Sequence, residues 1–256
     1  MAKEKTEILL TCKDTVFVNK PAGVSIPEVY SALDASGIET GQLQPIGNPD
    51  PEASGIVILS GNELWASKST DSPPAEITSL VLVNAITLQQ EGVIETLITQ
   101  NRKDYHKMTV TSRRGKKAVT RWELLAEFGA VSLLKIRPLT ARRHQIRVHL
   151  PHRSMPLAVD KLYGSKRGIY LSDIKRGYRP SGKKKESPLI ERLTVHTYQA
   201  ELTAAPREKG CPGKITAPLD KKFAAAIKML TKHGEKGRDA FLDQKDFERL
   251  MSGRPI

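Results

Sequence analysis

With 256 residues, of which 39 % are hydrophobic and 27 % charged, the chain is long enough for one large domain whose core needs no disulfide or metal. The two cysteines, Cys12 and Cys211, are too few for a disulfide framework or a cysteine-based zinc site, so we expect a reduced protein. No apolar run is long enough for a membrane span or a leader peptide, so we also expect the protein to be soluble and cytoplasmic. Lys and Arg number 41 against 28 acidic residues, and this net charge of +13 favours a polyanion as partner over a membrane.

Short β-prone runs dominate the chain. In chain order, two short strands split by a polar turn are predicted within 8–20, and further strands over 55–60, 80–83, 119–128, 131–136 and 193–202. Helices are predicted within 30–40 and from 218 to about 232, and the periodicity of 145–150 allows either a strand or a helix. Residues 67–75 and 164–187 read as exposed loops. Because strands outnumber helices and do not alternate with them regularly, a doubly wound parallel sheet is excluded.

The charge is divided unevenly along the chain. The first 100 residues hold 5 basic and 13 acidic side chains, so the basic excess lies entirely in the remainder. A basic region of this size favours nucleic acid as the partner over a merely solvated surface. Aromatic residues make up only 5 % of the chain, which argues against a base-stacking platform of the single-strand-binding kind.

The segment Leu139–Leu150 concentrates polar side chains that can bind RNA. It holds three arginines, two histidines and one glutamine, all of which can donate hydrogen bonds to phosphates or base edges. A basic strand edge with apolar residues turned into the core is the alternative interpretation. The nearby histidines, 144, 149 and 152, lack the carboxylate or cysteine pattern of a metal site, and no phosphate-binding glycine loop is present, so neither a metal nor a cofactor is expected.

Five segments resemble motifs of the RluA-type RNA pseudouridine synthases, in the order in which that family has them. Ala141–His149 resembles the signature G-R-x-H-Q-[IL]-R-x-H, with Ala141 in place of the glycine. The other four are Asn19–Gly23, Met155–Gly164, Arg192–Tyr198 and Ile215–Leu219. Five matches in order are specific where one is not. The resemblance spans roughly residues 8–225 and implies an α+β pseudouridine synthase fold, with a mixed, mostly antiparallel sheet, flanking helices and a central catalytic cleft.

The resemblance also implies the site. The family's catalytic aspartate stands before a Ser-Gly pair and a buried strand, a pattern that Asp50 matches with Ser54-Gly55. Arg147 is then its ion-pair partner, in a reaction that detaches uracil, rotates it and rejoins it through carbon without a cofactor. RNA is expected to contact Lys20, Arg142, Arg143, His144, Gln145 and Lys161. The basic stretches 102–121 and 161–185, with a lysine run at 183–185, are expected to line its approach.

Two positions depart from the family pattern. Asn48 stands where the family has an arginine that helps to flip the target nucleotide, and alignment of the strand at 80–83 puts Ser79 at the position of a base-stacking tyrosine. This would make the chain a degenerate member, in which another aromatic residue, Tyr105, Tyr163 or Trp65, has to reach the pocket if catalysis survives. Loss of one stacking ring weakens base positioning by about 1–3 kcal/mol.

Three functions therefore remain open. The first is an active synthase on ribosomal or transfer RNA, the second an inactive RNA-binding protein such as a ribosome assembly factor, and the third a basic scaffold without preference for RNA. We predict a catalytic domain over residues 1–232, a helical appendix over 233–256 and a monomer. The separate N-terminal RNA-binding domain of the family is expected to be absent, which would leave recognition to loops or to a partner such as a ribosomal particle.

Overall fold

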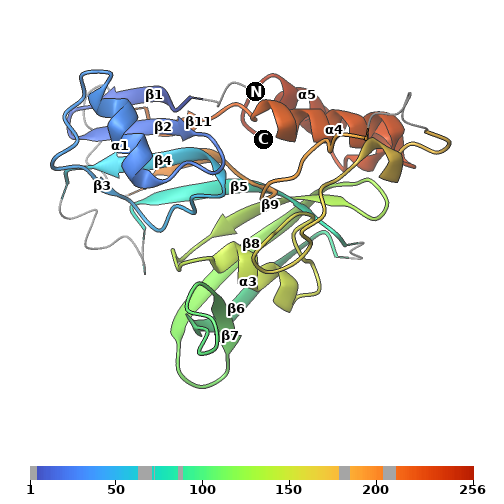
Figure 1. Cartoon of the computed structure of the whole chain (residues 1–256), viewed down its shortest axis with the longest axis horizontal. Coiled ribbons are helices and arrows are strands. Elements are labelled where there is room, and N and C mark those ends of the chain that lie inside the picture. The colour runs from blue at the N-terminus through green and yellow to red at the C-terminus, as the bar shows by residue number, and fades with distance from the viewer. Residues whose placement is uncertain (1–4, 63–70, 72, 86–88, 179–184, 204–211) are drawn as a thin grey trace.

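A large mixed β-sheet organises the chain. The computed structural model describes residues 5–62, 71, 73–85, 89–178, 185–203 and 212–256 (Figure 1). The strands are β1 (Glu7–Cys12), β2 (Thr15–Lys20), β3 (Gln44–Pro45), β4 (Ser54–Ser60), β5 (Ala75–Val83), β6 (Glu91–Gln100), β7 (Met108–Thr111), β8 (Lys116–Glu127), β9 (Ser132–Pro138), β10 (Val195–Leu202) and β11 (Lys214–Thr216). The helices described are α1 (Ile26–Asp34), α3 (Gln145–His152), α4 (Lys221–His233) and α5 (Gln244–Met251), with 3-10 turns η1 (Leu171–Asp173) and η2 (Gly237–Ala240).

The sheet is mixed and mostly antiparallel, as predicted. Its strand order is β1-β2-β4-β10-β5-β9-β8-β6-β7, with β11 beside β10 and β3 beside β4. Among the strand pairs of the described residues, only β4 and β10 run parallel. This arrangement follows from local hairpins such as β1–β2 and β8–β9, which need only short turns, whereas the parallel pair joins segments that are far apart in sequence.

The parallel pair at the centre of the sheet depends on one glycine. Every residue of β4 is buried, which explains why this strand reads as an unbroken apolar run rather than an alternating one. Gly55 pairs with Thr197 of β10 and has a positive φ of 102°. A Cβ atom at this position would overlap the carbonyl group of Thr197. The two strands can therefore come together only because residue 55 has no side chain.

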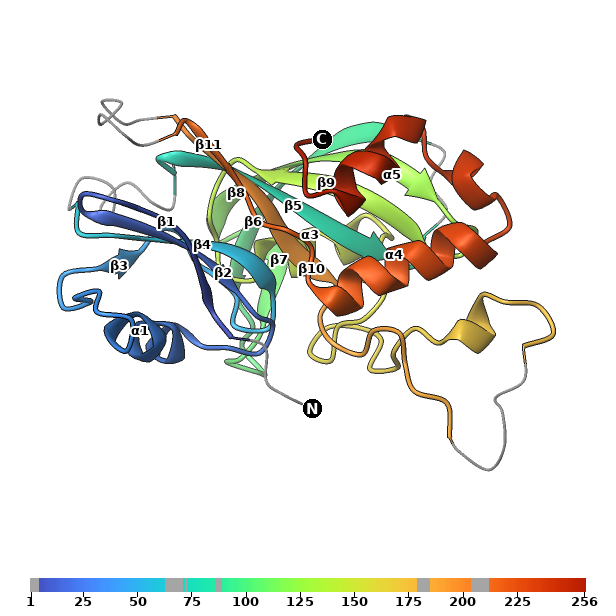
Figure 2. The same ribbon diagram turned by 90° about the horizontal axis from the view of Figure 1, so that it is seen from above.

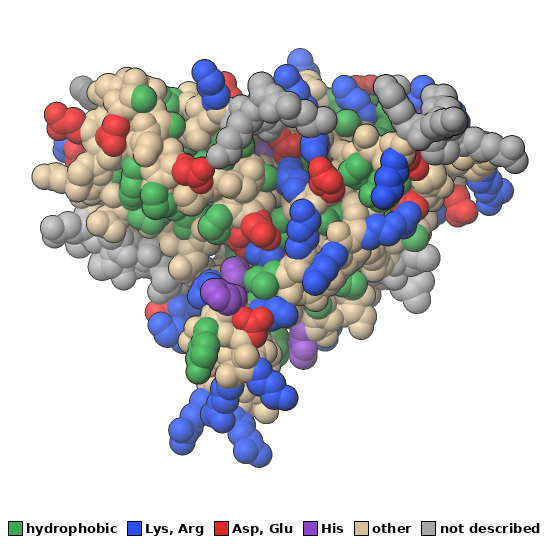
Figure 3. Space-filling view, viewed as in Figure 1, with side chains coloured by type: hydrophobic (Ala, Val, Ile, Leu, Met, Phe, Trp, Pro, Cys, Tyr) green, Lys and Arg blue, Asp and Glu red, His purple; other side chains and the backbone are tan. Residues whose placement is uncertain are grey.

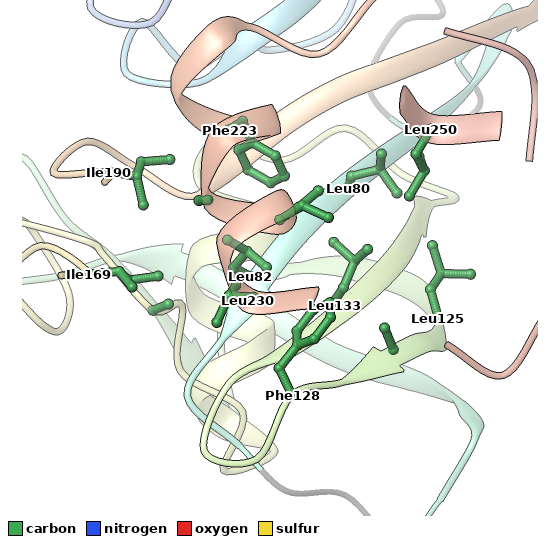
Figure 4. Packing of buried hydrophobic residues seen from close by; sticks show 14 of the residues in the cluster. Leu80, Leu82, Leu125, Phe128, Leu133, Ile169, Ile190, Phe223, Leu230 and Leu250 are labelled. Carbon is green, nitrogen blue, oxygen red and sulfur yellow. The ribbon is translucent and has the colours of Figure 1, made fainter. Parts of the chain in front are cut away.

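The largest hydrophobic cluster lies between the C-terminal helices and the sheet. Figure 4 shows Phe223 and Leu230 of α4 facing Leu80 and Leu82 of β5, and Leu250 of α5 belongs to the same cluster. Figure 2 shows α4 and α5 together over one face of this part of the sheet. The predicted appendix over 233–256 thus contains a helix, and its apolar side chains share a core with the rest of the chain. The predicted domain boundary at 232 stays a prediction.

Local capping determines where the helices begin. Asp220 accepts hydrogen bonds from the backbone N–H groups of Lys222 and Phe223, at 3.1 and 3.0 Å, so α4 begins at Lys221 inside the predicted segment. Glu28 accepts a hydrogen bond of 2.8 Å from the backbone N–H of Ser25, so α1 begins earlier than the predicted range 30–40. The segment 145–150, which periodicity left undecided, is the helix α3.

Two expectations concern the setting of the chain. Within the described residues, no helix is long and apolar enough to cross a membrane. The expectation of a reduced protein stays a prediction, because it depends on both cysteines and the structure describes only Cys12. Cys211 and Trp65 lie outside the described residues, as do most of the predicted loop 67–75 and Lys183 and Lys184.

Candidate active site

Asp50 lies in a tight turn directly before β4. Its Oδ1 atom accepts a hydrogen bond of 2.9 Å from the backbone N–H of Glu52, and its carbonyl accepts one of 3.2 Å from Ala53. Prolines at positions 49 and 51 restrict the backbone on both sides. The turn therefore presents the Asp50 carboxylate in one orientation at the start of the most deeply buried strand.

The side chain of Lys20 forms hydrogen bonds with the backbone of this turn. Its ammonium donates hydrogen bonds to the carbonyls of Pro21, Pro51 and Ala53, at 3.1, 2.8 and 2.6 Å, and the residue is only 2 % exposed. Burial lowers the pKa of Lys20 to about 8, against the opposing effect of the Asp50 charge. We predicted that Lys20 binds RNA. In the structure its ammonium is bonded to these three carbonyls and ties β2 to the Asp50 turn, and the RNA contact stays a prediction.

Arg147, in α3, joins three carboxylates. Its Nη1 donates to Oδ2 of Asp50 at 2.7 Å, and its Nη2 donates to Oε2 of Glu52 at 3.0 Å. Its Nε and Nη2 atoms also make a bidentate pair with Asp160, at 2.9 and 2.6 Å. Burial alone would lower the pKa of Arg147, but the hydrogen bond to Asp160 and the charges of Asp50 and Asp160 raise it above its ordinary value.

Asp160 is the residue that orients Arg147. It is 2 % exposed and accepts hydrogen bonds from the backbone N–H groups of Leu162 and Tyr163, at 2.9 and 3.0 Å. Because its own position is set by the backbone, it turns the guanidinium so that one nitrogen is left for Asp50. Sequence reasoning placed Asp160 in a motif but not in the site. Its position after the apolar residues 157–159 was the available signal for a buried, paired carboxylate.

His144 connects Asp50 to Tyr163. The histidine has a left-handed backbone conformation, with φ of 54°, and stands immediately before α3. Its Nδ1 atom lies 2.7 Å from the Tyr163 hydroxyl, which accepts a hydrogen bond of 2.6 Å from the backbone N–H of Met108. Its Nε2 atom lies 3.8 Å from Oδ2 of Asp50. Burial lowers the pKa of His144 against the opposing effect of the Asp50 charge, which favours a neutral ring at pH 7.

A pocket of about 160 Å³ opens beside Asp50 and Arg147. Apart from these charged groups its walls are largely apolar, with Ile146 from α3 and Val195 from β10. The wall formed by β5 includes both Ser79 and Ile77, which are two residues apart and so lie on the same face of the strand. The pocket thus combines a largely buried carboxylate with apolar surfaces.

None of the described residues that line this pocket is a phenylalanine, tyrosine or tryptophan. Tyr163 lies behind the charged end, where the guanidinium of Arg147 is 5.3 Å from the centre of its ring. Tyr105 is 69 % exposed and lies outside the pocket lining. Of the two considered aromatic residues that the structure describes, Tyr163 reaches the site, through His144 and Arg147, and Tyr105 does not, whereas Trp65 lies outside the described residues.

The mouth of the pocket is crossed by a contact between two loops. The side-chain amide of Asn48 donates a hydrogen bond to the carbonyl of Ala141, and a Cβ atom on Gly47 would lie 3.5 Å from that of Ala141. Asn48 is thus bound to backbone, where a long arginine would extend as a free cation. A glycine at 141 would leave this contact looser.

Gln145 serves the fold of the loop before α3. Its carbonyl oxygen accepts hydrogen bonds from the Thr140 hydroxyl and the Arg142 backbone, at 2.9 and 3.0 Å. Its amide nitrogen donates to the carbonyl of Val119 and to the hydroxyl of Thr120, both at 2.9 Å. The side chain is buried, and these four bonds use its hydrogen-bonding capacity. Gln145 therefore has a structural role in this loop, and its predicted RNA contact stays a prediction.

The remaining residues predicted to contact RNA differ in how exposed their side chains are. Arg142 is largely buried, donates 2.8 Å to the carbonyl of Lys117 and forms an ion pair with Asp71. Arg143 and Lys161 are exposed. Figure 3 shows further Lys and Arg side chains gathered at the lower tip of the molecule, where Figure 1 places the projecting strands β6 and β7. Exposed basic residues there are Arg102, Lys103, Arg113, Arg114, Lys116 and Lys117.

Two buried histidines next to the site predict acid sensitivity. Burial lowers the pKa of His149 to about 4 and that of His196 to about 3, both from 6.5. His149 lies between the hydroxyls of Thr96 and Thr120, and Nδ1 of His196 is 2.8 Å from that of Ser54. Below pH 6.5 the unfolded chain binds protons at these histidines while the folded chain does not. The free energy of unfolding therefore decreases as the pH is lowered.

As the pH is lowered from 6.5 to about 4.5, we expect each of the two histidines to reduce the free energy of unfolding by about 1.4 kcal/mol per pH unit. Denaturant titrations across this range measure the slope. The variant His149→Gln removes one titrating group, and its slope should be smaller than that of the wild type by one histidine's share. Equal slopes for the two proteins would contradict the assignment of His149 as a buried neutral histidine.

Comparisons with known proteins agree with this geometry. Residues 14–152 match the sequence pattern of the RNA pseudouridylate synthase family. An uncharacterized RNA pseudouridine synthase of Helicobacter pylori is 30 % identical over 243 residues, which cover 89 % of this chain and 77 % of that protein. The ribosomal large subunit pseudouridine synthase D of Borreliella burgdorferi is 42 % identical over 144 residues, covering 56 % of this chain and 38 % of that protein.

The fold of the chain is also similar to that of a solved structure. Human RNA Pseudouridylate Synthase Domain Containing 1 has 20 % identity and a TM-score of 0.60, with 84 % of each chain covered, which confirms the predicted fold. The matched part of the chain spans 57 % of an uncharacterized RNA pseudouridine synthase of Bacillus subtilis and 38 % of the Borreliella burgdorferi protein.

Proposed function

Because the chain belongs to the RNA pseudouridylate synthase family, we propose that it isomerises uridine to pseudouridine in RNA, with Asp50 as the nucleophile and Arg147 as its ion-pair partner. The observation that carries this proposal is the 2.7 Å pair of Asp50 and Arg147 at the charged end of a pocket whose walls are largely apolar. Several relatives are named as synthases of the ribosomal large subunit, which favours ribosomal over transfer RNA as the substrate.

The reaction explains why the site has this composition. The bond between C1′ and N1 of the uridine breaks, the uracil turns, and C5 bonds to C1′. The proton on C5 leaves and N1 gains one, so the product is an isomer. A carboxylate that assists bond breaking has to stay ionised although water is excluded, and Arg147 supplies the compensating charge. The apolar walls at Ile146 and Val195 hold the uracil without hydrogen bonds that would prevent its rotation.

RNA would approach over the exposed basic residues. Arg143 and Lys161 flank the site, and the basic residues of the β6–β7 turn, the β7–β8 turn and the start of β8 extend the positive surface beyond it. Lysines and arginines of this kind contact phosphates and so orient the RNA without reading its sequence. We expect a monomer that acts in the cytoplasm, on free RNA or on a ribosomal particle.

The second candidate function is RNA binding without catalysis. It is favoured by the pocket wall at Ile77 and Ser79, because no phenylalanine, tyrosine or tryptophan of the described residues lines the pocket. A base held only by aliphatic side chains loses about 1–3 kcal/mol of stacking. Under this hypothesis the fold and the Asp50–Arg147 pair persist while turnover is lost.

A pseudouridine assay separates the two functions. Wild type and Asp50→Ala are incubated with total RNA from cells that lack the modification, and pseudouridine is quantified by mass spectrometry. We expect product with the wild type and a loss on the order of 10⁴-fold or more with Asp50→Ala, because the reacting group is gone. RNA binding without product in either protein would support the second function and contradict the first.

A tyrosine introduced into the pocket wall should accelerate the reaction. In Ile77→Tyr the ring would extend from β5 towards the uracil position, and we expect roughly a tenfold rise in kcat/KM from the added stacking. Ile77→Leu, which adds no ring, is the matched control and should stay near the wild-type rate. A folded Ile77→Tyr protein with an unchanged or lower kcat/KM would show that stacking on this wall does not limit turnover.

A further inference from the structure

A second hollow adjoins the Asp50 turn. It has a volume of about 510 Å³. Six residues line both spaces, which are Gly47, Asn48, Pro49, Asp50, His144 and Arg147. The two cavities therefore meet at the Asp50 turn, so a nucleotide in the second would be a neighbour of a base held in the first.

The two sides of this hollow differ in chemistry. One side is apolar, with Ile26 at the start of α1 and Pro45 and Pro51 around the Asp50 turn. The other side carries His106 and Arg143, both exposed, and Nη2 of Arg143 lies 3.5 Å from the carbonyl of His106. Flat imidazole and guanidinium groups are surfaces on which unpaired RNA bases stack. The hollow can thus hold a base between an apolar wall and a stacking wall.

The turn that carries His106 is ordered by its own hydrogen bonds. The side chain of Asn101 accepts bonds from the backbone N–H groups of Lys103 and Asp104, at 2.8 and 3.2 Å. Asp104 in turn accepts one of 3.0 Å from the backbone N–H of His106. The imidazole is therefore presented from a turn whose backbone is tied in place, which reduces the entropy lost when a base stacks on it.

The charges in the hollow suit a strand that carries phosphates. Its acidic groups, Asp50 and Glu52, are both paired with Arg147. No acidic side chain in the described part of the chain forms an ion pair with Arg143, so its positive charge remains available. A phosphate next to the stacked base would meet this guanidinium at the rim.

We propose that this second hollow binds the nucleotide adjacent to the target uridine, with its base stacked on His106 and Arg143. The inference rests on the proposed function, because it takes the first pocket as the site of the uridine. His106 thereby becomes a residue that selects single-stranded substrates, since a neighbouring base can stack in the hollow only when it has left its own helix.

Binding measurements test this inference without relying on turnover. The probe is a synthetic RNA stem-loop with one loop uridine, and matched versions replace the nucleotide on its 5′ or its 3′ side by an abasic one. Affinities of the full chain are measured by fluorescence anisotropy for wild type, His106→Ala and Lys245→Ala. Lys245 is exposed on α5, away from both cavities, so its variant controls for the general effect of a surface substitution.

For the wild type we expect one of the two abasic substitutions to weaken binding by on the order of tenfold, because a stacked base is lost. In His106→Ala the same substitution should cost much less, since the stacking surface is already missing, whereas Lys245→Ala should show the full penalty. Equal penalties in wild type and His106→Ala, or no penalty in the wild type, would overturn the inference and leave the proposed function intact. Absence of binding to every stem-loop would overturn both.

Discussion

Replacing Arg147 with methionine should destabilise the protein by about 3–5 kcal/mol and abolish pseudouridine formation. The substitution leaves Asp160, which is 2 % exposed, without its bidentate partner, and Asp50 and Glu52 nearby without a compensating charge. An uncompensated buried carboxylate costs far more than the removal of an exposed pair. The free energy of unfolding from denaturant titration at neutral pH measures the loss.

Two further variants locate the origin of this effect. Arg147→Lys retains the charge but cannot bind Asp160 through two nitrogens, so its stability should fall between those of wild type and Arg147→Met. Arg143→Met removes an exposed arginine four residues earlier and should leave stability nearly unchanged, within about 0.5 kcal/mol. An unchanged unfolding midpoint in Arg147→Met would show that the three carboxylates are not held by this one guanidinium.

Replacing Gly55 with alanine should cost about 4 kcal/mol or more, enough to leave little folded protein. The added Cβ would overlap the Thr197 carbonyl at the parallel pairing of β4 and β10, and φ of 102° is a conformation that alanine rarely adopts. Thermal unfolding and yield of soluble protein measure the effect. Gly41→Ala is the matched control, because a Cβ there meets nothing within 4 Å, and it should have nearly wild-type stability.

If Gly55→Ala folds with wild-type stability, the close approach of β4 to β10 can relax. The Asp50 turn precedes β4 by only a few residues, so such relaxation should also be visible in the rate of pseudouridine formation. A stable and fully active Gly55→Ala protein would therefore contradict both the packing argument and the rigid placement of the Asp50 turn.

Local patterns in the sequence predicted a large share of the fold. The apolar run 55–60 indicated a buried strand, and a helix was predicted from 218 to about 232, where the structure has β4 and α4. These features could be predicted because strand burial and helix capping depend on residues close together in the chain. The segment 145–150 could not be assigned this way, because its helical form depends on packing against β7 and β8.

The sequence by itself determined the family, the basic half of the chain and the position of Asp50, since each is a pattern of neighbouring residue types. Only the tertiary structure decided what those side chains touch. It buried Lys20 and Gln145, two of the residues expected to contact RNA, in hydrogen bonds with the protein, and it brought Asp160 to Arg147 and Ile77 to the pocket. The physical reason is that burial and ion pairing join segments that are far apart in the chain, and they compete with solvent for the same polar groups.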